Sequence, residues 1–141
     1  MFRKIIAILV LVLVFSSAAY CQSFSEKKNS IGIDFPTFGW LLRNDQGQIE
    51  ANLGINYGLG ISYKRYFSPM KIQDFNPFWA VGSILVILPY AGVGVEYVWP
   101  NGWYFGGGVY ALSGLYMDRS YPSPRPLGVY VGPEIHGGYM F

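Results

Sequence analysis

Residues 49–64 read IEANLGINYGLGISYK, and two kinds of residue alternate along this stretch without interruption. Odd-numbered positions carry isoleucine, alanine, leucine or tyrosine, whereas even-numbered positions carry glycine or a polar side chain. Successive side chains of a β-strand point to opposite faces of the sheet, so a period of two indicates a strand. A helix would scatter the same residues around its axis. The stretch therefore predicts β-structure with one apolar face and one face of glycine and polar residues.

The same alternation recurs toward the C-terminus. It is present in short form from Ala91 to Trp99 and again over residues 127–141. The segment Pro100-Asn101-Gly102 predicts a tight hairpin turn, because Asn-Gly tolerates the positive φ that such turns need. These signals predict an all-β, antiparallel domain in which six strands are evident directly: residues 31–42, 49–63, 78–88, 90–99, 103–117 and 127–141.

The composition is apolar and poor in charge. Hydrophobic residues make up 52% of the 141 residues and charged residues 13%, against about 25% charged in a typical soluble domain. Such a chain is too apolar for disorder and carries too few charges for an ordinary water-facing surface. Two of the ten Lys and Arg precede the apolar N-terminal run, so eight remain against eight Asp and Glu. This balance gives no electrostatic argument for a nucleic-acid partner.

The first 21 residues have the pattern of a secretory signal peptide. Arg3 and Lys4 precede a run of eleven apolar residues, and small residues follow from Ser16 onward. The run is too short for a membrane-spanning helix, which needs about 20 apolar residues. We expect cleavage after Ala19 or after Cys21, and the second site leaves a mature domain of residues 22–141.

Cys21 is the only cysteine in the chain. Its isolation excludes an internal disulfide bond and a cysteine-based zinc site. Lipid modification of Cys21 is an alternative fate, but bacterial lipoprotein signals normally place a small residue before the cysteine, and Tyr20 stands there.

Two architectures produce strands with one apolar face. In a soluble barrel or sandwich the apolar face forms the core, whereas in a transmembrane barrel it meets lipid and the polar face lines the lumen. The second face here is mostly glycine with few polar side chains, which suits a narrow bore better than a surface in water. Aromatic residues at strand ends also favour lipid, because such residues form belts at membrane interfaces: Tyr97, Trp99 and Trp103. The second face then predicts a lumenal polar network: Glu50, Lys64, Glu96, Glu134 and His136.

The chain ends Tyr139-Met140-Phe141, with apolar residues alternating upstream at Val131 and Ile135. This end resembles the last strand of small bacterial outer-membrane β-barrel proteins, from which only Gly137 and Pro133 depart. The resemblance implies a bacterial outer-membrane location, contact with outer-membrane lipids, and recognition of Tyr139 and Phe141 by the barrel-assembly machinery.

Chain length limits the size of such a barrel. Eight strands use about 80 residues, which residues 22–141 supply, whereas sixteen would need about 160. We therefore expect an eight-stranded, up-and-down transmembrane β-barrel, whose bore is just wide enough for side chains to fill it. Only six of these eight strands are evident directly. Either some of the long segments contain a turn, near Tyr57-Gly58 or at Pro36, or the barrel closes only by association of chains.

The function that these features favour is a structural or surface-interaction role without catalysis, cofactor or metal. Recognition of a surface ligand would use the loops at residues 43–48 and 118–126. Three alternatives remain: a narrow or oligomeric pore, a lipid-modifying barrel enzyme, and a soluble lipocalin-like carrier with its apolar face inward. The enzyme would need His136 to activate Ser62 or Ser113.

Overall fold

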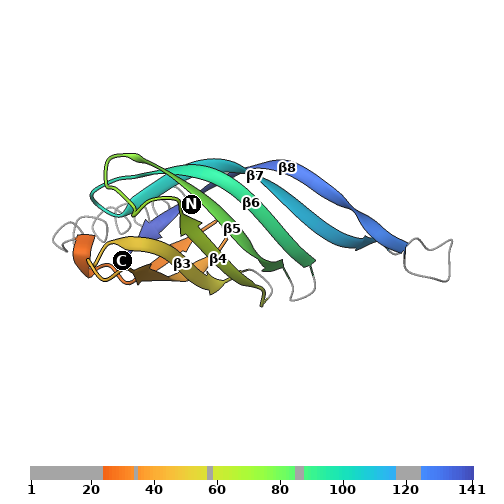
Figure 1. Ribbon diagram of the computed structural model, residues 1–141, viewed down its shortest axis with the longest axis horizontal. Coiled ribbons are helices and arrows are strands. Elements are labelled where there is room, and N and C mark those ends of the chain that lie inside the picture. The colour runs from red at the N-terminus through yellow and green to blue at the C-terminus, as the bar shows by residue number, and fades with distance from the viewer. Residues whose placement is uncertain (1–23, 34, 57–58, 85–87, 117–124) are drawn as a thin grey trace, which may run out of the picture.

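The computed structural model describes residues 24–33, 35–56, 59–84, 88–116 and 125–141. A short 3-10 helix, η2 (Phe24–Glu26), precedes eight strands. Each strand pairs antiparallel with the next, and the first pairs with the last, so one sheet closes into an up-and-down barrel (Figure 1). The strands are β1 (Asn29–Gly32), β2 (Phe38–Arg43), β3 (Ile49–Ile55), β4 (Ile61–Tyr66), β5 (Phe75–Ile84), β6 (Leu88–Val98), β7 (Trp103–Tyr116) and β8 (Arg125–Met140). The predicted fold class is confirmed.

Two of the predicted strands each contain a turn. Residues 31–42 divide into β1 and β2 with Pro36 between them, and residues 49–63 divide into β3 and β4. The second break includes residues 57 and 58, which lie outside the described residues, and Leu59 beside them has a positive φ of 73°. Closure within one chain removes the need for association.

Other predicted boundaries are wrong by a few residues. Strand β5 begins at Phe75 instead of residue 78, and β4 continues to Tyr66. The predicted boundary between strands at residue 89 is also wrong, because Pro89 is the second residue of β6 and pairs with Ser83. A proline is tolerated there since the first residues of a strand need fewer ladder hydrogen bonds.

The wall of the barrel is uneven in height. Strand β1 has 4 residues, whereas β7 has 14 and β8 has 16. Figure 1 shows β7 and β8 extending well past the other strands at one end. The C-terminus lies at the opposite end, where the N–H groups of Lys28 and Asn29 both donate to the Phe141 carbonyl at 2.8 Å.

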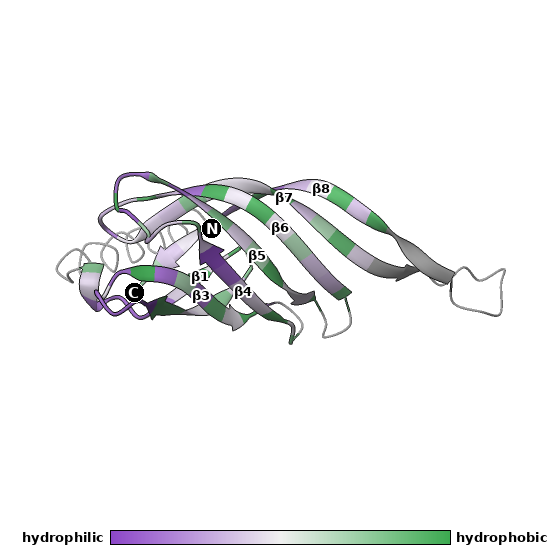
Figure 2. Cartoon of the chain, in the orientation of Figure 1, coloured by the Kyte–Doolittle hydropathy of each residue, from purple (hydrophilic) through white to green (hydrophobic). Residues whose placement is uncertain are grey.

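Apolar side chains cover the outside of the barrel. Figure 2 shows apolar and less apolar residues alternating along β6, β7 and β8. The large apolar residues that remain exposed include Ile31, Trp40, Leu53, Ile55, Ile61, Val81, Val93, Val95, Phe105, Val109, Val129, Val131 and Ile135. Polar side chains are buried instead, among them Ser30, Asn52, Ser62, Lys64, Asn76, Glu96 and His136. The predicted orientation of the two faces is therefore the one that the barrel has.

Ile49 is an exception to the predicted outward face. It is only 2% exposed and packs with the interior cluster that contains Leu41, Tyr66 and Met70. The cause is a bulge between β2 and β3, where Leu42 pairs with Ala51 but Arg43 pairs with Ile49. The extra residue, Glu50, shifts the alternation by one position at this end of the strand.

Inward-facing glycines give room to interior rings. A Cβ atom added at Gly94 would lie 2.7 Å from the Phe78 ring, and one at Gly92 would lie 2.5 Å from the Tyr110 ring. Real Cβ atoms do not approach so closely, so a side chain at either position would overfill the bore. The glycine-rich face therefore holds large aromatic residues from neighbouring strands.

Candidate functional site

The centre of the barrel holds a buried ion cluster. The Glu96 carboxylate on β6 accepts a hydrogen bond from the Lys64 ammonium on β4, with Nζ and Oε2 2.9 Å apart. His136 on β8 places Nε2 3.4 Å from the same oxygen. All three side chains are at most 1% exposed. The Glu96 carboxylate therefore connects strands β4, β6 and β8.

The other Glu96 oxygen is also satisfied. The Tyr66 hydroxyl donates to Oε1 at 2.5 Å. Because an isolated carboxylate would be very costly away from water, these partners make its burial tolerable. The alternation did not identify Tyr66, because this residue lies beyond the predicted end of the strand at residue 63.

Aromatic rings surround the Lys64 ammonium. Its Nζ lies 5.0 Å from the centre of the Phe78 ring and 5.2 Å from that of Tyr104. Phe78 also meets the His136 ring edge to face, with ring centres 5.4 Å apart. Such contacts stabilise a cation through the quadrupole of the ring. The cluster therefore combines an ion pair with a wall of aromatic residues, and together they fill the bore.

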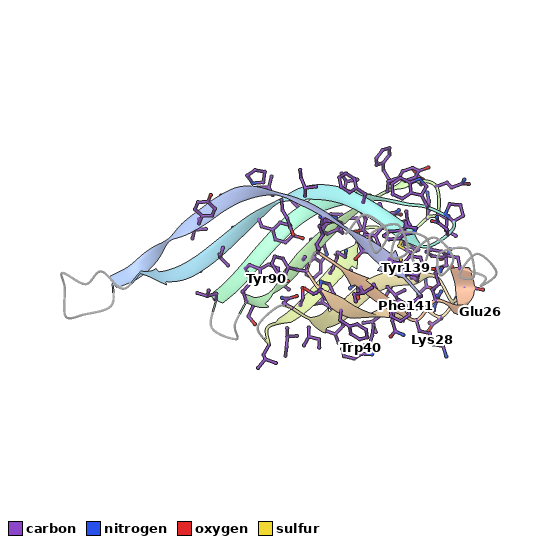
Figure 3. The ribbon with its side chains drawn as sticks, turned by 180° about the vertical axis from the view of Figure 1, so that it is seen from behind. Glu26, Lys28, Trp40, Tyr90, Tyr139 and Phe141 are labelled. Atoms are coloured by element: carbon purple, nitrogen blue, oxygen red, sulfur yellow. The ribbon has the colours of Figure 1, made fainter. Side chains whose placement is uncertain are left out.

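Two further groups of polar side chains are hydrogen-bonded inside the barrel. The Asn52 amide donates to the Ser30 hydroxyl at 2.8 Å. The Asn56 amide donates to the Ser83 carbonyl at 2.9 Å, and the Ser62 and Tyr90 hydroxyls are hydrogen-bonded to each other. Figure 3 places Tyr90 among the strands, toward the end where β7 and β8 extend.

The two serines considered for a lipid-modifying enzyme have other surroundings than His136. The hydrogen-bond partner of Ser62 is Tyr90, and the polar neighbour of His136 is Glu96. Ser113 is exposed on β7. Within the described residues, neither serine is hydrogen-bonded to His136.

The other two residues of the predicted network are only partly buried. Glu134 is half-buried beside a cavity of about 170 Å³ at the barrel mouth, which Phe35, Tyr110 and Tyr130 also line. Glu50 is the bulge residue described above and is half-exposed. In the part of the chain that the structure describes, its side chain makes no ion pair.

The predicted aromatic belt and the C-terminal signal residues form two sets of ring contacts, one on each side of the turn between β6 and β7. Tyr97 packs against Phe75 and Trp99, with ring centres 5.3 and 5.0 Å apart. Across the turn, Tyr139 packs against Trp103 at 5.3 Å. Further contacts then continue through Phe141 and Phe38 to Trp40. The rings therefore surround much of the barrel at the end that carries the C-terminus.

The two loops proposed for recognition lie at opposite ends of the barrel, because one follows β2 and the other follows β7. Residues 43–48 form a tight turn, in which the Asn44 side-chain oxygen accepts from the N–H groups of Gln46 and Gln48 at 3.0 Å. Arg43 donates to the Lys27 carbonyl at 2.7 Å and holds the turn against the chain that precedes β1. Residues 117–124 of the other loop lie outside the described residues.

Comparisons with known proteins leave the family open. No protein-family model matches the chain, and neither a curated protein nor a solved structure matches it. Within the described ranges, no group of three or more His, Cys, Asp or Glu side chains is placed to hold a metal ion. No helix in those ranges is long and apolar enough to cross a membrane.

Proposed function

We propose that the protein is an integral outer-membrane barrel with a closed bore and a non-catalytic role in surface interaction. The observation that carries this proposal is the pairing of an apolar exterior with charged residues at the centre. Trp40, Val93 and Ile135 are 48%, 55% and 71% exposed, whereas Glu96 and His136 are fully buried. A monomeric soluble protein rarely exposes so much contiguous apolar surface.

The same observation disfavours the carrier hypothesis. A lipocalin-like protein needs its apolar face inside, where it would enclose a ligand. Here the face that turns inward carries the Lys64–Glu96 ion pair. Neither residue lines the small cavity at the mouth of the barrel.

The filled bore disfavours the pore hypothesis. Lys64, Phe78, Tyr104 and His136 are at most 2% exposed, so side chains pack against each other at the level of Glu96. The bore of an eight-stranded barrel is just wide enough for its own side chains, so no passage remains for an ion. The part that remains available for interaction is the tall β7–β8 wall at the end away from the C-terminus.

Membrane fractionation combined with gel mobility tests this proposal. We expect the protein in the outer-membrane fraction after carbonate washing, and we expect the unboiled sample to migrate differently from the boiled one. In planar bilayers it should give no single-channel steps at any voltage. Recovery in the soluble fraction would contradict the membrane assignment, and regular conductance steps would contradict the closed bore.

A further inference from the structure

The last strand has a long edge without a partner strand. On its β1 side, β8 pairs only through Gly138, Tyr139 and Met140. The ladder ends with one more hydrogen bond, from the Ile33 N–H to the Gly137 carbonyl at 2.9 Å. From His136 back to Arg125, no described strand pairs with this side of β8.

Hydrogen bonds near the C-terminus show which main-chain groups face this edge. Phe141 exchanges two hydrogen bonds with Asn29 of β1, at 2.8 and 2.9 Å. Because the direction of these groups alternates along an antiparallel strand, odd-numbered residues of β8 face β1 and even-numbered residues face β7. Val129, Val131 and Ile135 therefore each present an N–H and a C=O to the free edge, and Pro133 presents a C=O.

Pro133 is compatible with its position in β8 because of the side of the strand that its nitrogen faces. It pairs with Val109 of β7, but its nitrogen points to the side without a partner strand. A proline in a sheet is found where no N–H is required, at an edge. Pro133 therefore marks the free edge without disturbing the β7–β8 ladder.

The free edge reaches the level of the hydrocarbon. This step rests on the proposed membrane insertion. A tilted strand crosses the bilayer in about 9–11 residues, so a span that begins at Phe141 ends near residue 131. Unpaired main-chain groups are costly there, which is why membrane-spanning sheets are normally closed. Outward-facing Val131 and Ile135 beside the edge are 61% and 71% exposed and offer no charge to deter pairing.

We propose that the β8 edge from Val129 to Ile135, named here the open edge, binds an extended segment of a second protein. The segment adds to the sheet as a strand antiparallel to β8 and continues the β1–β8 ladder beyond Gly137. Main-chain hydrogen bonds supply the binding, as in other cases of strand addition. Its outward side chains are apolar, to match Val129, Val131 and Ile135.

The mouth cavity gives the open edge selectivity. Gly132, Pro133 and Glu134 line both the edge and the cavity of about 170 Å³, together with Phe35 and Tyr110. An inward-facing apolar side chain of the added strand enters this space. A pocket for alternate side chains is what distinguishes one added strand from another.

A second copy of the chain fits the open edge less well. Two copies inserted the same way have β8 strands that run in the same direction. A symmetric pair of them would be parallel, so it would not continue the antiparallel ladder that β1 begins.

Amide hydrogen exchange of the full mature chain in lipid nanodiscs tests the proposal. Without a partner, the amides of Val129 and Val131, which lie near the membrane surface in this span, should exchange much faster than those of Tyr130 and Gly132, which face β7. The probe is a ten-residue peptide of alternating valine and threonine with one phenylalanine on the inward-facing side. Its addition should slow exchange at Val129 and Val131 and leave Tyr130 and Gly132 unchanged.

Two variants at one position provide the control. Val131→Pro removes an edge-facing N–H and should weaken peptide binding by about tenfold or more, whereas Val131→Thr keeps the N–H and should bind like the parent. Both should retain the mobility difference between boiled and unboiled samples, because the β7 ladder is intact.

The proposal would be overturned by slow exchange at Val129 and Val131 in the free monomer, by no slowing with the peptide, or by unchanged binding of the peptide to the Val131→Pro variant. Protection that depends on the concentration of the protein itself would also overturn it, in favour of self-association. Tryptophan quenching by brominated lipid in the same nanodiscs reports membrane insertion separately, so a failure of the proposed function is distinguishable from a failure of docking.

Discussion

Replacement of Glu96 by alanine should destabilise the folded barrel by about 3–5 kcal/mol, because it leaves the buried Lys64 ammonium without its counter-charge. The two groups are 2.9 Å apart and at most 1% exposed, so water cannot replace the lost carboxylate. The Tyr66 hydroxyl loses its acceptor in the same variant. The measurement is the free energy of unfolding in urea, followed by tryptophan fluorescence in lipid vesicles.

Two further variants separate charge loss from a general effect of mutation. Glu26→Ala at the exposed N-terminal side should change stability by less than about 0.5 kcal/mol. The double variant Glu96→Leu with Lys64→Met should be more stable than Glu96→Ala, because no unpaired charge remains. A Glu96→Ala barrel as stable as the parent would show that the ion cluster does not hold the interior together.

Replacement of Val93 by arginine should cost about 2–4 kcal/mol in a bilayer, as expected for a charge on the lipid face at mid-depth. Val93 lies at the middle of β6, between Trp79 and Val109 on the neighbouring strands, and is 55% exposed. The measurement is reversible folding into vesicles of the parent and the variant. Gln46→Arg, in the exposed turn after β2, is the matched control and should be nearly neutral.

The Val93 result also distinguishes the two orientations of the sheet. If the outer face met water, arginine at position 93 would be tolerated as an ordinary surface substitution. A stability equal to that of the parent in vesicles would therefore contradict the assignment of this face to lipid.

Alternation was enough to predict the fold because it is a local signal. The period of two over residues 49–64 identified both the strands and the face that turns outward, and chain length then limited the strand number. The hidden turns near Pro36 and Tyr57-Gly58 followed from the need for an even count. Each of these steps uses neighbouring residues or total length alone.

The parts that the sequence did not predict depend on contacts between distant residues. The bulge at Glu50 moves Ile49 inside, and it arises from pairing with β2. Tyr66 meets Glu96 across 30 positions of sequence, so only the three-dimensional arrangement brings them together. The open edge results from the unequal heights of β1 and β8, which no single strand pattern encodes.

The central claim is that the apolar face of the barrel touches hydrocarbon, and the four tryptophans report on it directly. Trp40, Trp99 and Trp103 are 48%, 41% and 45% exposed, and Trp79 lies half-buried on an outward position of β5; Figure 3 shows Trp40 at the outer side of the ribbon. In vesicles of lipids brominated on their acyl chains, tryptophan fluorescence should lose most of its intensity, while aqueous acrylamide should have little effect. Fluorescence that brominated lipid leaves unchanged and acrylamide quenches would contradict the account.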